Sequence, residues 1–98
     1  MKCRFFLMLA ASLHSICPSA GPVLPVDEVA PGLFVHWGTV AFSDQHNHGA
    51  IANIGFVVGE RCVVVVDSGG NPAQGRALKQ AVNRVTDKPI CYVINTHV

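Results

Sequence analysis

Apolar residues are spaced along the chain in a way that predicts three β-strands before residue 67. Residues 33–37 (LFVHW) are rich in β-forming side chains and predict a first strand. Within residues 50–58, apolar side chains recur at every second position from Ile54 to Val58, which is the period of a half-buried strand. Residues 62–66 (CVVVV) lack polar alternation, as strands covered on both faces do. The short link at residues 59–61 predicts an antiparallel hairpin between the second and third strands.

A helix is predicted over residues 72–85, followed by a fourth strand at residues 90–94 (ICYVI). Asn71 is a good N-cap, and Pro72 suits the first helical position. Apolar residues at helical spacing form one stripe: Ala77, Leu78, Ala81, Val82 and Val85. Pro89 disfavours helix at the residue before it. A crossover this short is expected to join parallel neighbouring strands.

These elements predict the α/β class, with antiparallel hairpin strands followed by a strand–helix–strand crossover. The chain has 98 residues, a formal net charge of +1 and 50% hydrophobic residues. This composition predicts one small domain at most. It excludes a disordered tail and a polycation, so we expect no nucleic-acid partner.

Residues 1–20 have the layout of a secretory signal peptide. Lys2 and Arg4 precede a short apolar run, Phe5 to Leu13, that is too brief for a membrane span. We expect cleavage near Ala20, an extended lead-in over residues 21–32, and a domain over residues 33–98. The protein would then be periplasmic or secreted, with no membrane span after signal removal. The alternative is an uncleaved apolar N-terminus.

Two cysteines, Cys62 and Cys91, follow the predicted signal peptide. Each lies five residues before a strand end, at Asp67 and Thr96 respectively. If the two strands were parallel neighbours in that register, the cysteines would lie about 4.8 Å apart, which is within disulfide reach. Because free cysteine also packs as a small hydrophobic side chain, we favour two free buried thiols.

Candidate chemistry is concentrated at Asp67 and His97, each at the carboxyl end of a predicted parallel strand. Open α/β sheets bind their ligands at that edge, and neighbouring strands would place these two residues within several ångströms. A neutral imidazole is a good zinc ligand, and a carboxylate beside it can orient it. A catalytic zinc usually needs three protein ligands, so these residues do not complete a site.

Other polar residues are weaker candidates. His46 and His48 lie two apart in the polar loop 43–49, a spacing that can serve a metal, but a solvated loop is the favoured interpretation. His36 is expected to be a hydrogen-bonded or surface side chain. The turn at residues 68–70 (SGG) fails both common nucleotide-binding spacings, so its glycines more simply permit a tight turn.

The chain resembles the first part of the metallo-β-lactamase superfamily, most closely the exported quinoprotein relay system zinc metallohydrolases. The resemblance covers roughly residues 29–98 and rests on three segments: residues 52–58 (ANIGFVV), residues 63–70 (VVVVDSGG) and residues 92–98 (YVINTHV). It implies a four-layer αββα sandwich, of which this chain would supply part of one sheet and one outer helix.

In that family the histidine after Asn-Thr opens a His-x-His-x-Asp-His metal motif. His97 matches its first position and Val98 its second, which makes His97 the first ligand of an incomplete motif. Asp67 matches an aspartate that supports the metal loop without being a usual ligand. The loop 43–49 matches the flap beside the active site, and no ligand role is carried over to its histidines.

The resemblance therefore implies an N-terminal fragment of a zinc hydrolase that binds one or two ions. A metal-bound hydroxide would attack a small-molecule substrate. The fragment alone, which contains no catalytic residues and lacks the C-terminal half of the domain, is expected to be inactive and to bind zinc weakly. The alternative is a small exported, non-catalytic α/β module that binds a partner through an exposed sheet edge.

Overall fold

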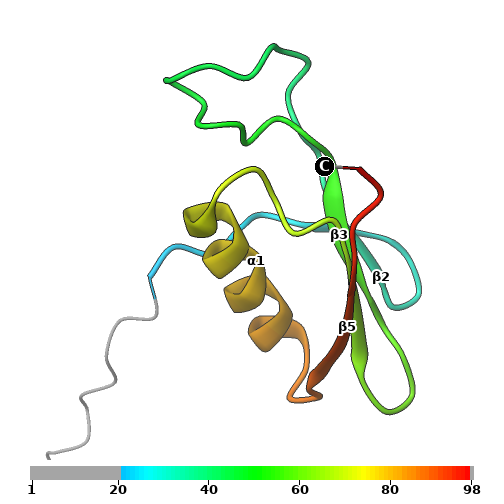
Figure 1. Cartoon of the computed structure of the whole chain (residues 1–98). Coiled ribbons are helices and arrows are strands. Elements are labelled where there is room, and N and C mark those ends of the chain that lie inside the picture. Colours follow the sequence, from blue (N-terminus) through cyan, green and yellow to red (C-terminus); the bar gives the residue numbers. More distant parts are fainter. Residues whose placement is uncertain (1–20, 98) are drawn as a thin grey trace, which may run out of the picture.

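The fold is a five-stranded mixed sheet with one helix packed against it, described by a computed structural model over residues 21–97 (Figure 1). The predicted signal peptide and Val98 lie outside the described residues. The elements follow one another as β1 (Asp27–Ala30), β2 (Leu33–His36), β3 (Ile54–Val58), β4 (Val63–Val66), α1 (Pro72–Val85) and β5 (Ile90–Ile94). The sheet order is the chain order. The α/β class is confirmed.

The pairing pattern confirms the predicted hairpin and crossover. Each pair of neighbouring strands from β1 to β4 is antiparallel. After the chain has passed through α1, β5 pairs with β4 in parallel. In Figure 1 the helix lies against one face of the sheet, and the connection between β2 and β3 extends beyond one end of it. That end also holds the carboxyl ends of β4 and β5. The crossover therefore defines the edge where the candidate residues meet.

Strand β1 was not predicted, because it lies within the segment interpreted as an extended lead-in. All four of its residues are exposed, and Asp27 pairs with Val35 while Glu28 pairs with Phe34. The strand is therefore held by its backbone ladder and buries no apolar side chain that would give a strand-like pattern.

Local signals fixed the helix bounds as predicted. The Asn71 side chain accepts a hydrogen bond from the backbone N–H of Gln74 at 2.8 Å. The Gln74 side chain returns to accept one from the backbone N–H of Gly70, also at 2.8 Å. This arrangement is a capping box displaced by one residue, and it satisfies two backbone donors at the start of α1.

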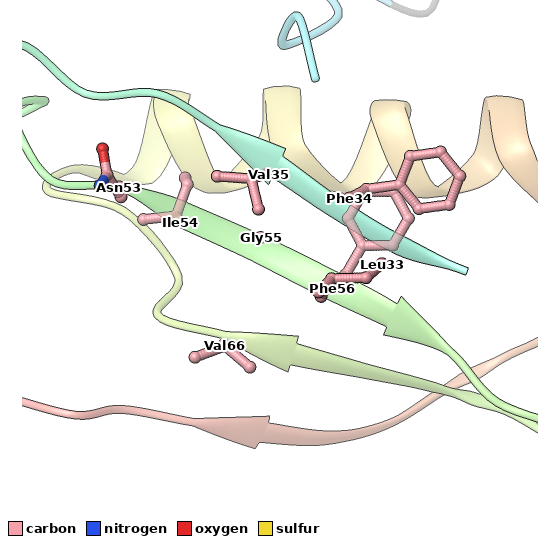
Figure 2. Close-up of a pocket in the computed structure, with 8 residues that line it drawn as sticks. All are labelled: Leu33, Phe34, Val35, Asn53, Ile54, Gly55, Phe56 and Val66. Carbon is pink, nitrogen blue, oxygen red and sulfur yellow. The ribbon is translucent and has the colours of Figure 1, made fainter. Parts of the chain in front are cut away.

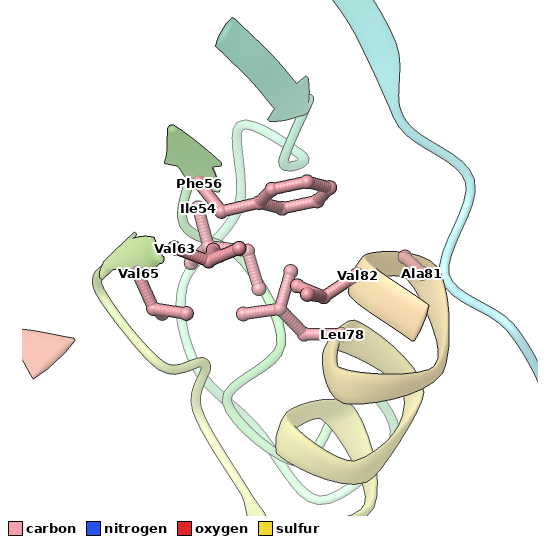
Figure 3. Close-up of a cluster of buried hydrophobic side chains, with 7 residues drawn as sticks. All are labelled: Ile54, Phe56, Val63, Val65, Leu78, Ala81 and Val82. Carbon is pink, nitrogen blue, oxygen red and sulfur yellow. The ribbon is translucent and has the colours of Figure 1, made fainter. Parts of the chain in front are cut away.

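The core lies between α1 and the sheet face that it covers. Figure 3 shows side chains from β3, β4 and α1 converging there. Phe56 is fully buried and stacks on Phe34 of β2, with ring centroids 4.9 Å apart. The cluster consists of Ile54, Phe56, Val63, Val65, Leu78, Ala81 and Val82. Alternate residues of β3 and β4 face this cluster, which accounts for the alternating burial along β4; in β3, Gly55 between them is buried as well.

The opposite face of the sheet is apolar and is not covered by a helix in the described part of the chain. Leu33 pairs with Val57, and Val64 pairs with Tyr92, so these side chains share that face. Tyr92 is 65% exposed. A hollow of about 230 Å³ near Gly55 is lined by side chains of β2, β3 and β4 (Figure 2). A face this apolar is typical of an interaction surface.

A disulfide joins Cys62 and Cys91, whose Cα atoms are 5.8 Å apart. The favoured expectation of two free buried thiols is therefore wrong, and the alternative is correct. The register also differs from the one considered, because Val63 pairs with Ile90 whereas the next residue of β4 pairs with Tyr92. Cys91 is the extra residue of this irregularity and is exposed. A bulge of this kind cannot be found by counting residues back from strand ends.

No helix within residues 21–97 is long and apolar enough to cross a membrane.

Replacing Phe56 by alanine should lower the free energy of unfolding by about 3–5 kcal/mol, because it removes a buried ring and leaves a cavity. Val57→Ala is the matched control on the same strand, since that side chain is 38% exposed on the other face. We expect it to cost less than about 1 kcal/mol. Urea unfolding of both variants checks this. Equal losses would contradict the assignment of the core to the helix side.

Candidate functional site

A hollow of about 420 Å³ opens at the carboxyl ends of β4 and β5. The turn after β4 supplies Asp67 and residues 68–70, and the end of β5 supplies Asn95 and His97. The β2–β3 connection and the start of β3 form the other side, lined by Ser43, Gly49, Ile51, Ala52 and Ile54. A second hollow of about 400 Å³, lined mainly by residues 38–41 and 51–53, also includes His97. The histidine is therefore accessible from two directions.

Asp67 turns the chain sharply as β4 ends. Its φ of 59° lies in the left-handed region, which aspartate tolerates better than most residues. Its backbone N–H still donates to the carbonyl of Ile94 at 2.7 Å, so the parallel ladder reaches this residue. The turn leaves the carboxyl group 14% exposed and facing the end of β5.

Thr96 connects Asp67 to His97. Its backbone N–H donates to Asp67 Oδ1 and its hydroxyl donates to Asp67 Oδ2, both at 2.7 Å. The same hydroxyl lies 2.9 Å from His97 Nδ1. His97 Nδ1 is 3.8 Å from Asp67 Oδ1. The predicted proximity of Asp67 and His97 is confirmed. The intermediary hydroxyl was not predicted, and the Asn-Thr-His order gave no independent signal for it.

The donor in each of these contacts can be assigned from the single proton of the hydroxyl. Thr96 donates that proton to Asp67, so its oxygen can only accept from the imidazole. When the His97 ring is neutral, its Nδ1 therefore carries the hydrogen and Nε2 keeps its lone pair. Histidines that bind a metal through one ring nitrogen usually donate a hydrogen bond from the other nitrogen, and that bond fixes the tautomer. Nδ1 and Nε2 of His97 match this arrangement.

The same contacts keep Asp67 ionised. Hydrogen bonds from the backbone N–H and then the hydroxyl of Thr96 hold the pKa of Asp67 below its ordinary value. Partial burial opposes this effect, and the neighbouring His97 lowers the pKa further by a smaller amount. The ionised Asp67 therefore stabilises the fold at pH values above the ordinary pKa of aspartate. This stabilisation is lost as the pH falls through the lowered pKa.

Among the described residues, no other histidine belongs to this group. The His46 side chain is 88% exposed and lies 3.9 Å from Asp44, so the solvated-loop interpretation fits it. The His36 ring lies 2.8 Å from the carbonyl of Pro25, which confirms a hydrogen-bonded role. Within residues 21–97, no group of three or more His, Cys, Asp or Glu side chains is placed to hold a metal ion.

Asn71 attaches the β2–β3 connection to the turn beside the site. Its side-chain oxygen caps α1, while its side-chain nitrogen donates to the carbonyl of His48 at 2.9 Å. Gly49 and Gly70 also meet so closely that a Cβ at Gly70 would collide with the Gly49 carbonyl. The capping function of Asn71 was predicted. Its second bond was missed, because no sequence pattern connects residues 23 positions apart.

Fold and site together define a class: an α/β domain with its candidate chemistry at the carboxyl ends of parallel strands. Residues 48–98, just over half of the chain, match the sequence model of the metallo-beta-lactamase superfamily. The chain belongs to this superfamily, whose members are mostly hydrolases that usually bind zinc. The matched region includes β3, β4, α1, β5, Asp67 and His97. No curated protein matches the chain at a significant level.

Replacing Thr96 by valine should raise the pKa of Asp67, because one of its two strongest hydrogen bonds is lost. The backbone N–H of residue 96 remains, so the pKa should stay below its ordinary value. A pH titration of the Asp67 carboxyl carbon by NMR measures this. Thr86→Val is the control, since the Thr86 hydroxyl accepts a hydrogen bond from the Lys88 backbone N–H at the C-terminal end of α1. An unchanged pKa in Thr96→Val would contradict the account.

Replacing Asn71 by aspartate separates its two functions. Aspartate caps a helix about as well as asparagine, but it has no side-chain N–H for His48. We expect unchanged thermal stability and faster amide exchange at residues 48–51. Hydrogen exchange of that loop is compared with exchange in α1. Equal acceleration in both regions would show that the cap, not the loop contact, was lost.

Proposed function

We propose that this chain is the N-terminal part of an exported zinc-dependent hydrolase, with His97 as the first zinc ligand and Asp67 as its supporting carboxylate. The observation that carries the proposal is the connection from Asp67 through Thr96 to His97. It leaves the unprotonated Nε2 on a ring that lines a solvent-accessible hollow. Membership of the metallo-beta-lactamase superfamily supports the reaction class.

The described residues fit zinc as one part of a site. Imidazole nitrogen is a preferred zinc ligand, and its partner carboxylate is a common orienting group. The remaining ligands would come from sequence after Val98 in the parent protein, so the 98-residue chain alone is proposed to be inactive. When bound, zinc would supply an acidified water as the nucleophile for hydrolysis of a small-molecule substrate.

Each described residue has a defined part in this proposal. Asp67, ionised at neutral pH, accepts two hydrogen bonds from Thr96 and fixes the orientation of its hydroxyl. That hydroxyl accepts from Nδ1 and prevents the His97 ring from changing tautomer. The β2–β3 connection borders the hollow and would contact the substrate, as the flap in the resemblance does.

Export is supported by two independent observations. Residues 1–20 carry the basic start and apolar run of a signal peptide. The Cys62–Cys91 disulfide is of the kind that persists in the periplasm or outside the cell. Within the superfamily, the resemblance to the quinoprotein relay system zinc metallohydrolases is our prediction for the subfamily.

A second candidate function is non-catalytic binding of a partner through strand addition. β5 is the last strand of the sheet, and its outer edge has no partner strand within residues 21–97. Residues 91–94 are all exposed and none is charged. An uncharged, exposed edge strand can accept an extended peptide as an additional strand.

Zinc binding tests the first function against the second. We expect the parent protein to retain zinc, and His97→Ala to lower its zinc affinity by at least about tenfold. His46→Ala is the matched control, since that exposed histidine should not affect affinity. Asp67→Asn should lower affinity by about 10–100-fold. Competition with a chromophoric chelator measures each value. Equal affinities for wild type and His97→Ala would reject the hydrolase assignment and favour partner binding.

A further inference from the structure

The last strand of the sheet is weakly anchored, although it carries the proposed zinc ligand. Ile90 packs partly against the core, whereas residues 91–94 are exposed. Among the described strands, β5 pairs with β4 alone, and parallel pairing is slightly less stable per residue than antiparallel pairing. Backbone hydrogen bonds lie at the two ends of this pairing. Val63 N–H donates to the Pro89 carbonyl at 2.8 Å, and Asp67 N–H donates to the Ile94 carbonyl at 2.7 Å.

The side chains of β5 do not specify how the strand is aligned on β4. After Ile90, the residues CYVI place apolar side chains on both faces, and residues 91–94 are all exposed. A strand with no difference between its faces is prone to register slippage. A slip of one residue would move the strand by about 3.3 Å and turn its side chains to the other face. Thr96 would then leave Asp67, and His97 would lose its partner.

The Cys62–Cys91 disulfide is placed to prevent this slip. It joins the residue before β4 to the irregular position of β5, at the end of the ladder opposite the site. Val63 pairs with Ile90 but Val64 pairs with Tyr92, so the bridge lies where the alignment changes. A covalent bond here allows one alignment of the strand downstream.

We propose that the Cys62–Cys91 disulfide is a positioning element of the zinc site, because it fixes the register of β5 and so places Thr96 and His97 against Asp67. This inference rests on the proposed role of His97. Its geometric part, the effect of the bridge on the His97 ring, does not require zinc. The zinc-ligand role of His97 and the positioning effect of the disulfide can therefore fail separately.

The test compares the full chain with its Cys62→Ala/Cys91→Ala variant by nitrogen NMR of the histidine rings, at about pH 8 where an ordinary imidazole is neutral. In the bridged chain, His97 should show hydrogen on Nδ1 and a free Nε2. In the variant, we expect both nitrogens to report a mixture of tautomers, and β5 amides to exchange at least about tenfold faster. The His36 ring and the α1 amides serve as internal controls.

Three outcomes are distinguishable. A change confined to β5 and His97 supports the proposal. Identical His97 signals in the two proteins overturn it, because the register is then fixed without the bridge. Simultaneous loss of the His36 and α1 signals also overturns it, because the bridge would then stabilise the fold as a whole. Reduction of the unaltered chain with dithiothreitol, which converts the bridge to two thiols, provides an independent second measurement.

Discussion

The parallel pairing of β4 with β5 determines where the candidate site lies. Antiparallel neighbours would put the ends of these strands at opposite edges of the sheet, whereas parallel pairing brings Asp67 and His97 to one edge. Parallel pairing requires a crossover, which α1 provides while covering the core face. The same helix carries the residue that attaches the neighbouring loop, because Asn71 is its N-cap.

Features governed by neighbouring residues in sequence were predictable, and features governed by distant contacts were not. The bounds of α1 follow from Asn71, Pro72 and an apolar stripe, all within the helix itself. β1 was not predicted from the sequence, because none of its side chains is buried. The disulfide was not favoured, because free cysteines also pack as small hydrophobic side chains, and the irregularity at Cys91 gave no signal in the sequence. The hydroxyl of Thr96 could not be assigned before its distances to two other side chains were known.

In the described part of the chain, α1 covers one face of the sheet and packs against a core centred on Phe56. The other face is not covered by a helix and exposes apolar side chains such as Leu33 and Tyr92. The site is similarly partial, since Asp67, Thr96 and His97 prepare one imidazole nitrogen without completing a metal centre. Both features agree with our proposal that further sequence of a metallo-beta-lactamase domain completes the site and the sheet packing.

The most direct test of this account is the coding sequence immediately after the Val98 codon. We expect this coding sequence to continue in frame with residues of the type His-x-Asp-His, which would follow His97 and Val98 to complete the metal motif. A stop codon at that point, with no such residues encoded downstream, would leave His97 without fellow ligands. That result would contradict the hydrolase assignment and leave a partner-binding module as the function of the chain.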